Sequence, residues 1–92
     1  MTYEWDPAKA AANVRKHGVS FEEAASVFLD PAALTFRDPD HSADEERAIT
    51  IGQSRRQRIL FVAHTEREVR LRIISARRAT RQEQDHYGGR HR

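Results

Sequence analysis

Four short runs rich in β-branched and aromatic residues follow one another from the middle of the sequence onward. Runs of this length and composition are typical of β-strands. The polar segments between them predict an exposed acidic loop at 38–46 and hairpin turns at 54–57 and 66–68. Strands joined this closely pair with their sequence neighbours, which predicts an antiparallel meander. The expected strands are 34–37, 47–53, 58–65 and 69–76.

Two short helices are expected before these strands. Asp6 can cap the first helix, and Pro7 suits its first helical position. Gly18 supplies the left-handed residue at which this helix ends. The second helix begins with a capping box, in which Ser20 and Glu23 can each accept a hydrogen bond from the backbone N–H of the other. Helices joined by so tight a turn form a hairpin, whose apolar face must pack on another element.

The two ends of the chain complete the expected fold. Residues 3–5 are a short aromatic strand candidate. Thr80 and Glu83 form a second capping box, which predicts a helix to about Tyr87, with 88–92 as a frayed tail. We therefore expect one α+β domain over residues 1–92: a short N-terminal strand, a helical hairpin packed on a twisted, mainly antiparallel sheet, and a short C-terminal helix.

Composition excludes several classes of function. No stretch approaches the roughly 20 apolar residues of a membrane span, and the first residues lack the basic and apolar regions of a secretory signal, so we expect a soluble, cytoplasmic protein. The absence of cysteine excludes disulfides, thiolate metal sites and cysteine nucleophiles. The five histidines lack zinc spacing, and segment 38–44 lacks the glycine and terminal glutamate of a calcium loop. We expect no metal and no cofactor.

The formal net charge of +2 conceals a division along the chain. Residues 1–46 contain four basic and ten acidic side chains, a net charge of −6, whereas residues 47–92 contain twelve arginines and four acidic side chains, a net charge of +8. The basic half is a candidate for binding a polyanion. Arginine suits bidentate phosphate recognition and stacking on bases, although a GC-rich genome gives the same preference over lysine.

Side-chain alternation predicts which residues of the last two strands share a face. If the pairing register permits, His64 is expected on the same face as Arg72. Such a face is suited to RNA, because arginine binds phosphate and histidine moves protons near neutral pH. The alternative is that these are ordinary solvated strand positions. In the last strand we expect Leu71, Ile73, Ser75 and Arg77 on one side, and Arg70, Arg72, Ile74 and Ala76 on the other.

Several charged pairs are also candidates for chemistry. In one interpretation they are surface ion pairs worth ~0 to 1 kcal/mol each, or a helix end that suits the helix dipole. In the other, a carboxylate or histidine takes the proton of a ribose 2'-hydroxyl while arginine neutralises the pentavalent phosphate, a cleavage that needs no metal. The candidates are Glu46-Arg47, Glu66-Arg67, Arg77-Arg78 and Lys16-His17.

Two motifs carry a resemblance to a known family. The first is Lys16-His17-Gly18-Val19-Ser20-Phe21-Glu22-Glu23-Ala24, and the second is Arg72-Ile73-Ile74-Ser75-Ala76-Arg77. Both resemble the pattern of the BrnT toxins. The resemblance spans nearly the whole chain and includes Tyr3-Glu4-Trp5-Asp6-Pro7-Ala8-Lys9, Asn13, Glu46-Arg47, Ile51-Gly52, Thr65-Glu66-Arg67, Ala79, Glu83 and Tyr87.

The resemblance implies a RelE-like fold and RNA cleavage that inhibits translation as part of a stress response. It also implies a partner, a BrnA-like antitoxin encoded next to the toxin, which blocks the active face. That antitoxin carries a DNA-binding domain for autorepression, so operator DNA is contacted only through it. In the family, toxin and antitoxin form a two-plus-two heterotetramer.

The matching motifs also suggest site residues. At position 64 the family commonly has an aromatic residue, often Tyr, so His64 either replaces a stacking residue or adds a base. The expected catalytic residues are His17, Glu46, Arg47, Glu66, Arg67 and Arg77. The expected substrate-binding residues are Lys16, His64, Arg70, Arg72 and Arg78.

Three functions remain open at this stage. The leading hypothesis is a metal-independent endoribonuclease. The alternative is a non-catalytic basic module, such as a degenerate toxin, that binds an antitoxin or nucleic acid. A DNA-binding regulator is the weakest of the three, because no helix-turn-helix with a basic recognition helix is visible.

Overall fold

The first helix forms as its capping residues predict. In the computed structural model, which describes residues 1–40 and 46–89, helix α1 spans Pro7–His17. The Asp6 carboxylate accepts a hydrogen bond from the Ala8 backbone N–H at 2.8 Å. Gly18 ends the helix with φ of 68°, where a residue with a side chain would be strained.

Asp30-Pro31 predicts the end of the second helix, but its regular α-helical part ends earlier. Helix α2 spans Phe21–Ala25 and continues as a tighter 3₁₀ turn, η1, over Ser26–Leu29. The Ser20 hydroxyl accepts a hydrogen bond from the Glu23 backbone N–H at 3.0 Å, so this half of the capping box is confirmed. The Glu23 carboxylate instead turns into the protein and binds Arg58.

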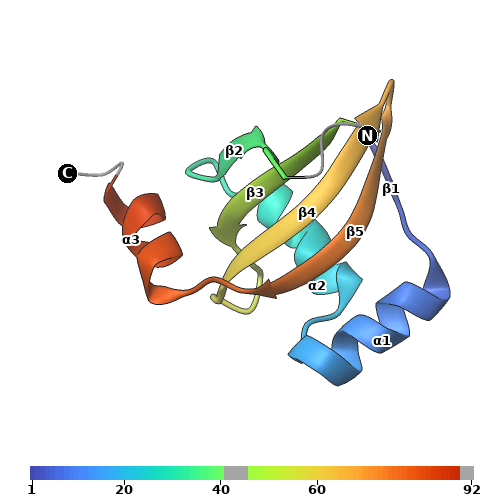
Figure 1. Ribbon diagram of the computed structural model, residues 1–92, viewed down its shortest axis with the longest axis horizontal. Helices are drawn as coiled ribbons and strands as arrows, with labels where there is room; N and C mark the ends of the chain where they lie inside the picture. The colour runs from blue at the N-terminus through green and yellow to red at the C-terminus, as the bar shows by residue number, and fades with distance from the viewer. Residues whose placement is uncertain (41–45, 90–92) are drawn as a thin grey trace.

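One sheet holds the five strands in the order β1-β5-β4-β3-β2, as Figure 1 shows. The expected antiparallel meander is confirmed for the four later strands, while the N-terminal strand lies parallel to β5 at the sheet edge. Residues 41–45 of the expected acidic loop lie outside the described residues. The strands are β1 (Thr2–Glu4), β2 (Leu34–Arg37), β3 (Arg47–Gln53), β4 (Ile59–Arg67) and β5 (Arg70–Arg78).

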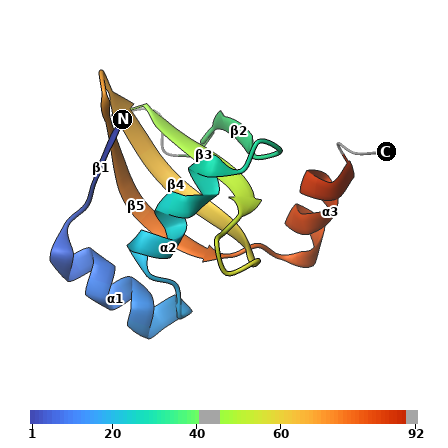
Figure 2. The same cartoon turned by 180° about the vertical axis from the view of Figure 1, so that it is seen from behind.

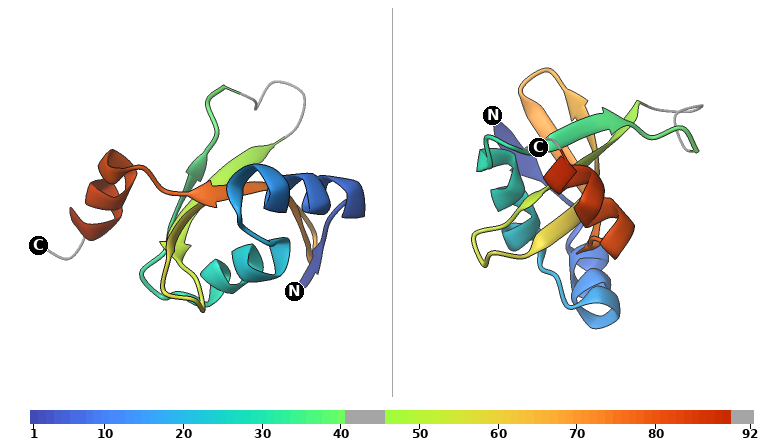
Figure 3. Two further views of the ribbon diagram at one scale, coloured as in Figure 1. Left: turned by 90° about the horizontal axis from the view of Figure 1, so that it is seen from below. Right: turned by 90° about the vertical axis from the view of Figure 1, so that its left-hand side faces the viewer.

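The helical hairpin covers one face of this sheet, as expected from its apolar side. Figure 2 shows α2 in front of the strands and α1 beyond the end of β1 and β5, and Figure 3 shows the molecule from two further sides. We call the side that the hairpin covers the helix face and the other the open face. The helix face holds the larger core cluster: Val19, Phe21, Ala24, Val27, Leu60, Val62, Leu71, Ile73 and Ala76.

Asn13 is a buried polar link between α1 and the sheet. Its Nδ2 donates hydrogen bonds to the backbone oxygens of Val19 at 2.9 Å and Ala76 at 2.7 Å. Its Oδ1 accepts a hydrogen bond from the Ala76 N–H at 3.2 Å. These bonds satisfy backbone groups that the helix would otherwise bury without partners, and they fix α1 against β5.

A β-bulge corrects the face assignment for β5. Ala63 pairs with Ser75 but His64 pairs with Ile73, so Ile74 is an extra residue in the strand. Strict alternation therefore fails beyond Ile73. Arg70, Arg72, Ser75 and Arg77 pair with open-face residues of β4, whereas Leu71, Ile73 and Ala76 lie in the helix-face core.

The turn between β4 and β5 is shorter than predicted. The turn was expected over 66–68, but β4 continues to Arg67 and β5 begins at Arg70, leaving two connecting residues. Glu68 has φ of 55°, a conformation more usual for glycine or asparagine. The tighter turn makes Arg67 and Arg70 direct cross-strand neighbours.

The C-terminal helix packs beside the open face. Helix α3 spans Arg81–Gly89, so Gly88 and Gly89 are helical rather than part of a tail, and residues 90–92 lie outside the described residues. Both halves of the predicted Thr80–Glu83 capping box form, at 2.8 and 3.2 Å. The Tyr87 hydroxyl donates a 2.6 Å hydrogen bond to Asp30, and its ring packs against an apolar cluster centred on Ile49, Ile51 and Ala63.

A buried ionic cluster joins α2 to the start of β4. The Glu23 side chain is 2% exposed and accepts hydrogen bonds from Arg58 Nε at 2.9 Å and Ser54 Oγ at 2.6 Å. The Arg58 hydrogen bond lowers the pKa of Glu23 below its ordinary value of 4.5. The stabilisation from this carboxylate is therefore complete above pH 4.5 and is lost as the pH falls through the lowered pKa.

Arg58→Ala is expected to lower the free energy of unfolding by roughly 3 kcal/mol, because it leaves the buried Glu23 carboxylate without its main partner. Urea denaturation at pH 7 measures the loss. Arg56→Ala is the matched control: Arg56 lies 3.9 Å from the same carboxylate but its side chain is 65% exposed, so its loss should stay below about 1 kcal/mol. Equal losses in the two variants would contradict this account.

Candidate functional site

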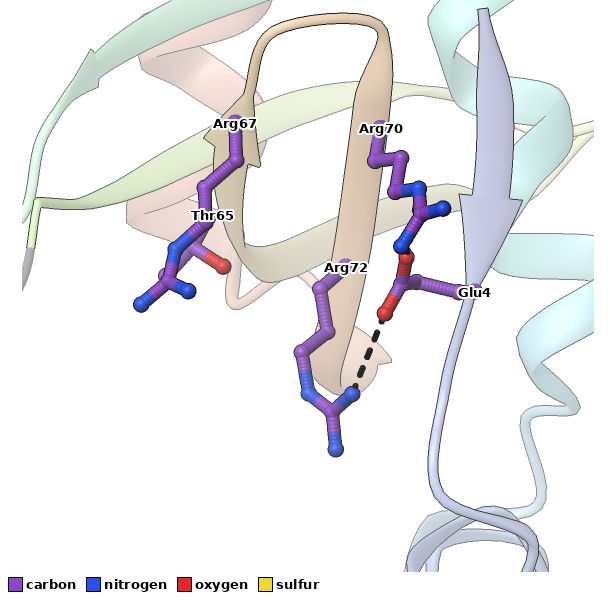
Figure 4. Close-up of a pocket in the computed structure, with 5 residues that line it drawn as sticks. All are labelled: Glu4, Thr65, Arg67, Arg70 and Arg72. Atoms are coloured by element: carbon purple, nitrogen blue, oxygen red, sulfur yellow. Dashed lines mark hydrogen bonds and ion pairs between the residues drawn. The ribbon is translucent and has the colours of Figure 1, made fainter.

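Arginine side chains line a hollow on the open face, at the end of the sheet where β4 turns into β5. The hollow has a volume of about 330 Å³. Figure 4 shows its side chains extending from three neighbouring strands into the same space. Its lining residues are Glu4, Thr65, Arg67, Arg70 and Arg72, and we call it the arginine hollow.

Strand register explains why these residues meet. Thr65 pairs with Arg72 across β4 and β5, and Arg72 pairs with Glu4 across β5 and β1. Arg67 and Arg70 form the next pair towards the turn. Directly paired residues present their side chains on the same face, so the five form two adjacent rows.

The charge of the arginine hollow is positive, because three guanidinium groups surround one carboxylate. Glu4 Oε2 accepts a hydrogen bond from Arg72 Nη1 at 3.2 Å, and Glu4 Oε1 lies 3.9 Å from Arg70 Nε. Arg67 contributes a further charge from the opposite side of the hollow (Figure 4). Guanidinium groups bind phosphate oxygens in pairs, so the arrangement suits an anionic group such as a phosphodiester.

The structure brings together one predicted catalytic residue, Arg67, and two predicted substrate-binding residues, Arg70 and Arg72, and adds two further residues. Arg67, Arg70 and Arg72 all line the arginine hollow. Glu4 and Thr65 were not predicted as site residues, although both occur in the family motifs. Periodicity could not have found Glu4, because it gives no sign that β1 pairs with β5.

Glu46, Arg47 and Glu66 line a different hollow, of about 360 Å³, beside β2 and β3. Arg47 pairs with Thr65 and so lies next to the arginine hollow in the same row. Glu66 pairs with Leu71, a core residue of the helix face, and therefore points to the other side of the sheet from Thr65.

Lys16, His17 and Arg78 lie at the opposite end of the sheet. The Gly18 carbonyl, just after α1, accepts a 3.1 Å hydrogen bond from Arg58, which precedes β4. Arg78 pairs with Leu60 near the start of β4, whereas the arginine hollow lies at the end of that strand. These three predicted residues therefore do not join the arginine hollow.

Arg77 is held by partners on the open face. Its guanidinium carbon lies 4.0 Å from the centre of the Phe61 ring, and two of its nitrogens contact the Glu83 carboxylate at 2.8 and 2.9 Å. This bidentate pairing lowers the pKa of Glu83. Arg77 thus connects β5 to α3, a positioning contact that sequence analysis did not foresee.

His64 does not share a face with Arg72, and that prediction is wrong. The side chain is fully buried on the helix face, where Nε2 lies 2.8 Å from Thr50 Oγ1 and the ring meets the Phe28 ring edge-on at 4.9 Å. The hairpin register separates the two residues, because Arg72 pairs with Thr65 whereas His64 pairs with Ile73. His64 therefore lacks the exposed surface that contact with a substrate requires.

Burial lowers the pKa of His64 from 6.5 to about 4. Below pH 6.5 the unfolded chain binds a proton that the folded protein does not. Stability is therefore expected to fall between pH 6.5 and about 4, on the order of 1 kcal/mol per pH unit. Urea denaturation between pH 7 and pH 5 tests this, and His64→Gln should remove most of the slope. An unchanged slope in that variant would mean that other groups cause it.

The fold and sequence of this chain are similar to those of known proteins. The family model described as "Ribonuclease toxin, BrnT, of type II toxin-antitoxin system" matches residues 5–83. The chain belongs to the BrnT family. The crystal structure of the Brucella abortus ribonuclease toxin BrnT is similar at 26% sequence identity and a TM-score of 0.68, covering 88% of this chain and all of that one. No curated protein sequence matches the chain significantly.

Membership of the BrnT family makes this chain the toxin half of a type II toxin-antitoxin system, in a family described as ribonucleases. An antitoxin partner follows from that classification. Among residues 1–40 and 46–89, no helix is long and apolar enough to cross a membrane. In the same residues, no group of three or more His, Asp or Glu side chains is placed to hold a metal ion.

Proposed function

We propose that this BrnT toxin is a metal-independent endoribonuclease that binds the scissile phosphate of RNA in the arginine hollow. The observation that carries the proposal is the convergence of Arg67, Arg70 and Arg72 around one open space on a ribonuclease-family fold. The arginines come from two paired strands, so their backbone positions are fixed before any ligand arrives.

The cleavage that fits this site uses the RNA's own 2'-hydroxyl as nucleophile. The 2'-oxygen forms a bond to phosphorus while the bond to the 5'-oxygen breaks, leaving a 2',3'-cyclic phosphate and a 5'-hydroxyl. Negative charge builds on the phosphate oxygens, and the arginines stabilise it in a preorganised site. Glu4, the carboxylate that lines the arginine hollow, accepts the 2'-hydroxyl proton, and water protonates the leaving oxygen.

The other predicted site residues do not contact the scissile phosphate in this proposal. Glu46 and Arg47 border the neighbouring hollow, where the RNA strand continues, whereas Glu66 points to the other side of the sheet and does not contact the RNA. Lys16, His17 and Arg78 lie too far along the sheet to contact the same phosphate, and Lys16 and Arg78 contribute only long-range positive charge. Arg77 acts through Glu83 by holding α3 in place.

We further propose that the antitoxin is BrnA-like and blocks the open face, with two copies of each chain in the complex. The toxin's cleavage of RNA then inhibits translation when antitoxin is scarce. An antitoxin that covers the arginine hollow blocks the access of RNA to all three arginines, so binding there is sufficient to inhibit the toxin. In this proposal the antitoxin, and not the toxin, binds operator DNA.

Arg72→Ala is expected to lower kcat/KM for RNA cleavage by about 30- to 1,000-fold, the range typical of losing one charge-stabilising donor. Purified protein is incubated with a labelled RNA in EDTA-containing buffer, and the products are resolved on a gel. Wild-type protein should cleave in EDTA and yield cyclic phosphate ends.

The matched control is Arg15→Ala, which removes an exposed arginine from α1 on the other face and should leave the rate unchanged. Equal rates for Arg72→Ala and wild type would reject the arginine hollow as the cleavage site. RNA binding without cleavage by wild-type protein would favour the non-catalytic module instead. Cleavage that stops in EDTA and returns with added metal would reject metal independence.

A further inference from the structure

A second, more apolar groove lies on the open face, between the sheet and α3. Its volume is about 580 Å³. The floor is formed by side chains of β2, β3 and β4, and one wall by the side of α3. The lining residues are Phe36, Ile51, Phe61, Gln82, Glu83, Asp85 and His86, and we call this space the aromatic groove.

Register places the aromatic groove next to the arginine hollow. Phe36 pairs with Ile49, and Ile49 pairs with Ala63, so these residues form one row across the open face. The adjacent row contains Thr65 of the arginine hollow. With strands ~4.8 Å apart and same-face residues ~6.6 Å apart along a strand, Phe36 and Thr65 lie roughly 12 Å from each other. One or two nucleotides of an extended strand span such a distance.

The two sites differ in chemistry. The described residues that line the aromatic groove include no arginine or lysine, and Asp85 adds an exposed carboxylate. Glu83 is already paired with Arg77. A phosphate is therefore unfavourable there, whereas the floor offers an aromatic ring, Phe36, that is 39% exposed. Bases stack on exposed aromatic rings, and their edges form hydrogen bonds with polar groups at a rim.

The wall of the aromatic groove is fixed in place by two contacts. The Arg77–Glu83 pair anchors the start of α3 to β5, and the Tyr87 hydroxyl anchors its other end to Asp30. A wall held at both ends keeps a constant width, which favours a flat ring entering edge-first over a bulkier group.

We propose that the aromatic groove is a nucleobase subsite, which holds a base adjacent to the phosphate bound in the arginine hollow, with Phe36 as its stacking residue. The inference rests on the proposed function for the identity of the ligand as RNA. It adds a residue that contacts a base, which the phosphate contacts alone cannot supply, because phosphates are the same at every position of the strand.

Binding of a non-cleavable RNA tests this subsite separately from catalysis. Short oligonucleotides in which every 2'-hydroxyl is methylated cannot be cut by 2'-hydroxyl attack, and fluorescence anisotropy gives their Kd. Phe36→Leu keeps an apolar side chain but removes the aromatic face, and should weaken binding by about ten-fold. Phe36→Trp should restore wild-type affinity or exceed it. Leu29→Ala, at an apolar residue 80% exposed on η1, is the control and should bind normally.

An oligonucleotide series with one abasic position, moved along the strand, identifies the stacked base. At one position the abasic RNA should bind wild-type protein as weakly as intact RNA binds Phe36→Leu, and combining both changes should cause no further loss. Additive losses at every position, or an unaffected Phe36→Leu, would overturn the subsite.

The experiments distinguish failure of the nucleobase subsite from failure of the proposed ribonuclease activity. If wild-type protein fails to cleave unmodified RNA but shows the base-dependent binding, the ribonuclease proposal fails and the subsite stands. If cleavage depends on Arg72 while binding ignores Phe36, the subsite fails and the ribonuclease proposal stands. Phe36→Leu that binds RNA normally but no longer binds the antitoxin would assign the aromatic groove to a protein partner and overturn the proposal.

Discussion

The antiparallel pairing of β4 with β5, including its bulge, is the constraint on which the rest of the structure depends. Before the bulge the pairing places Thr65 opposite Arg72, and after it the pairing places Phe61 opposite Arg77. If β5 kept strict alternation through Ile74 instead of forming the bulge, Arg77 would point into the helix-face core, where an unpaired charge is very costly. The bulge therefore allows one strand to contribute both to a dry core and to a charged open face.

The two faces of the sheet use polar groups differently. On the helix face, the buried side chains of Glu23 and Asn13 form hydrogen bonds within the protein that hold helices to strands. On the open face, charges line hollows that a ligand can enter, and among the elements of residues 1–40 and 46–89 only α3 covers part of the surface. A rigid sheet supported from behind is a suitable platform for phosphate recognition, because the arginines need little reorganisation when a substrate binds.

Sequence patterns predicted the local structure well, since the signals for it are local. The Asp6 cap, the Gly18 stop and the meander are all confirmed. What sequence could not supply was long-range register: the bulge reversed the expected face of Arg77, and parallel pairing brought Glu4 beside Arg72 across nearly the whole chain. A bulge changes the face on which all later residues of its strand lie. The alternation of polar and apolar residues in one strand does not show where a bulge occurs.

The most direct test of the central claim is nuclear magnetic resonance of the arginine side-chain Nε–Hε groups during titration with a methylated, non-cleavable RNA. The account predicts the largest shift changes at Arg67, Arg70 and Arg72, with small changes for the amides of Lys16 and His17 at the far end of α1. Large changes confined to the end of α1, with the three arginines unaffected, would contradict it and place the RNA at the opposite end of the sheet.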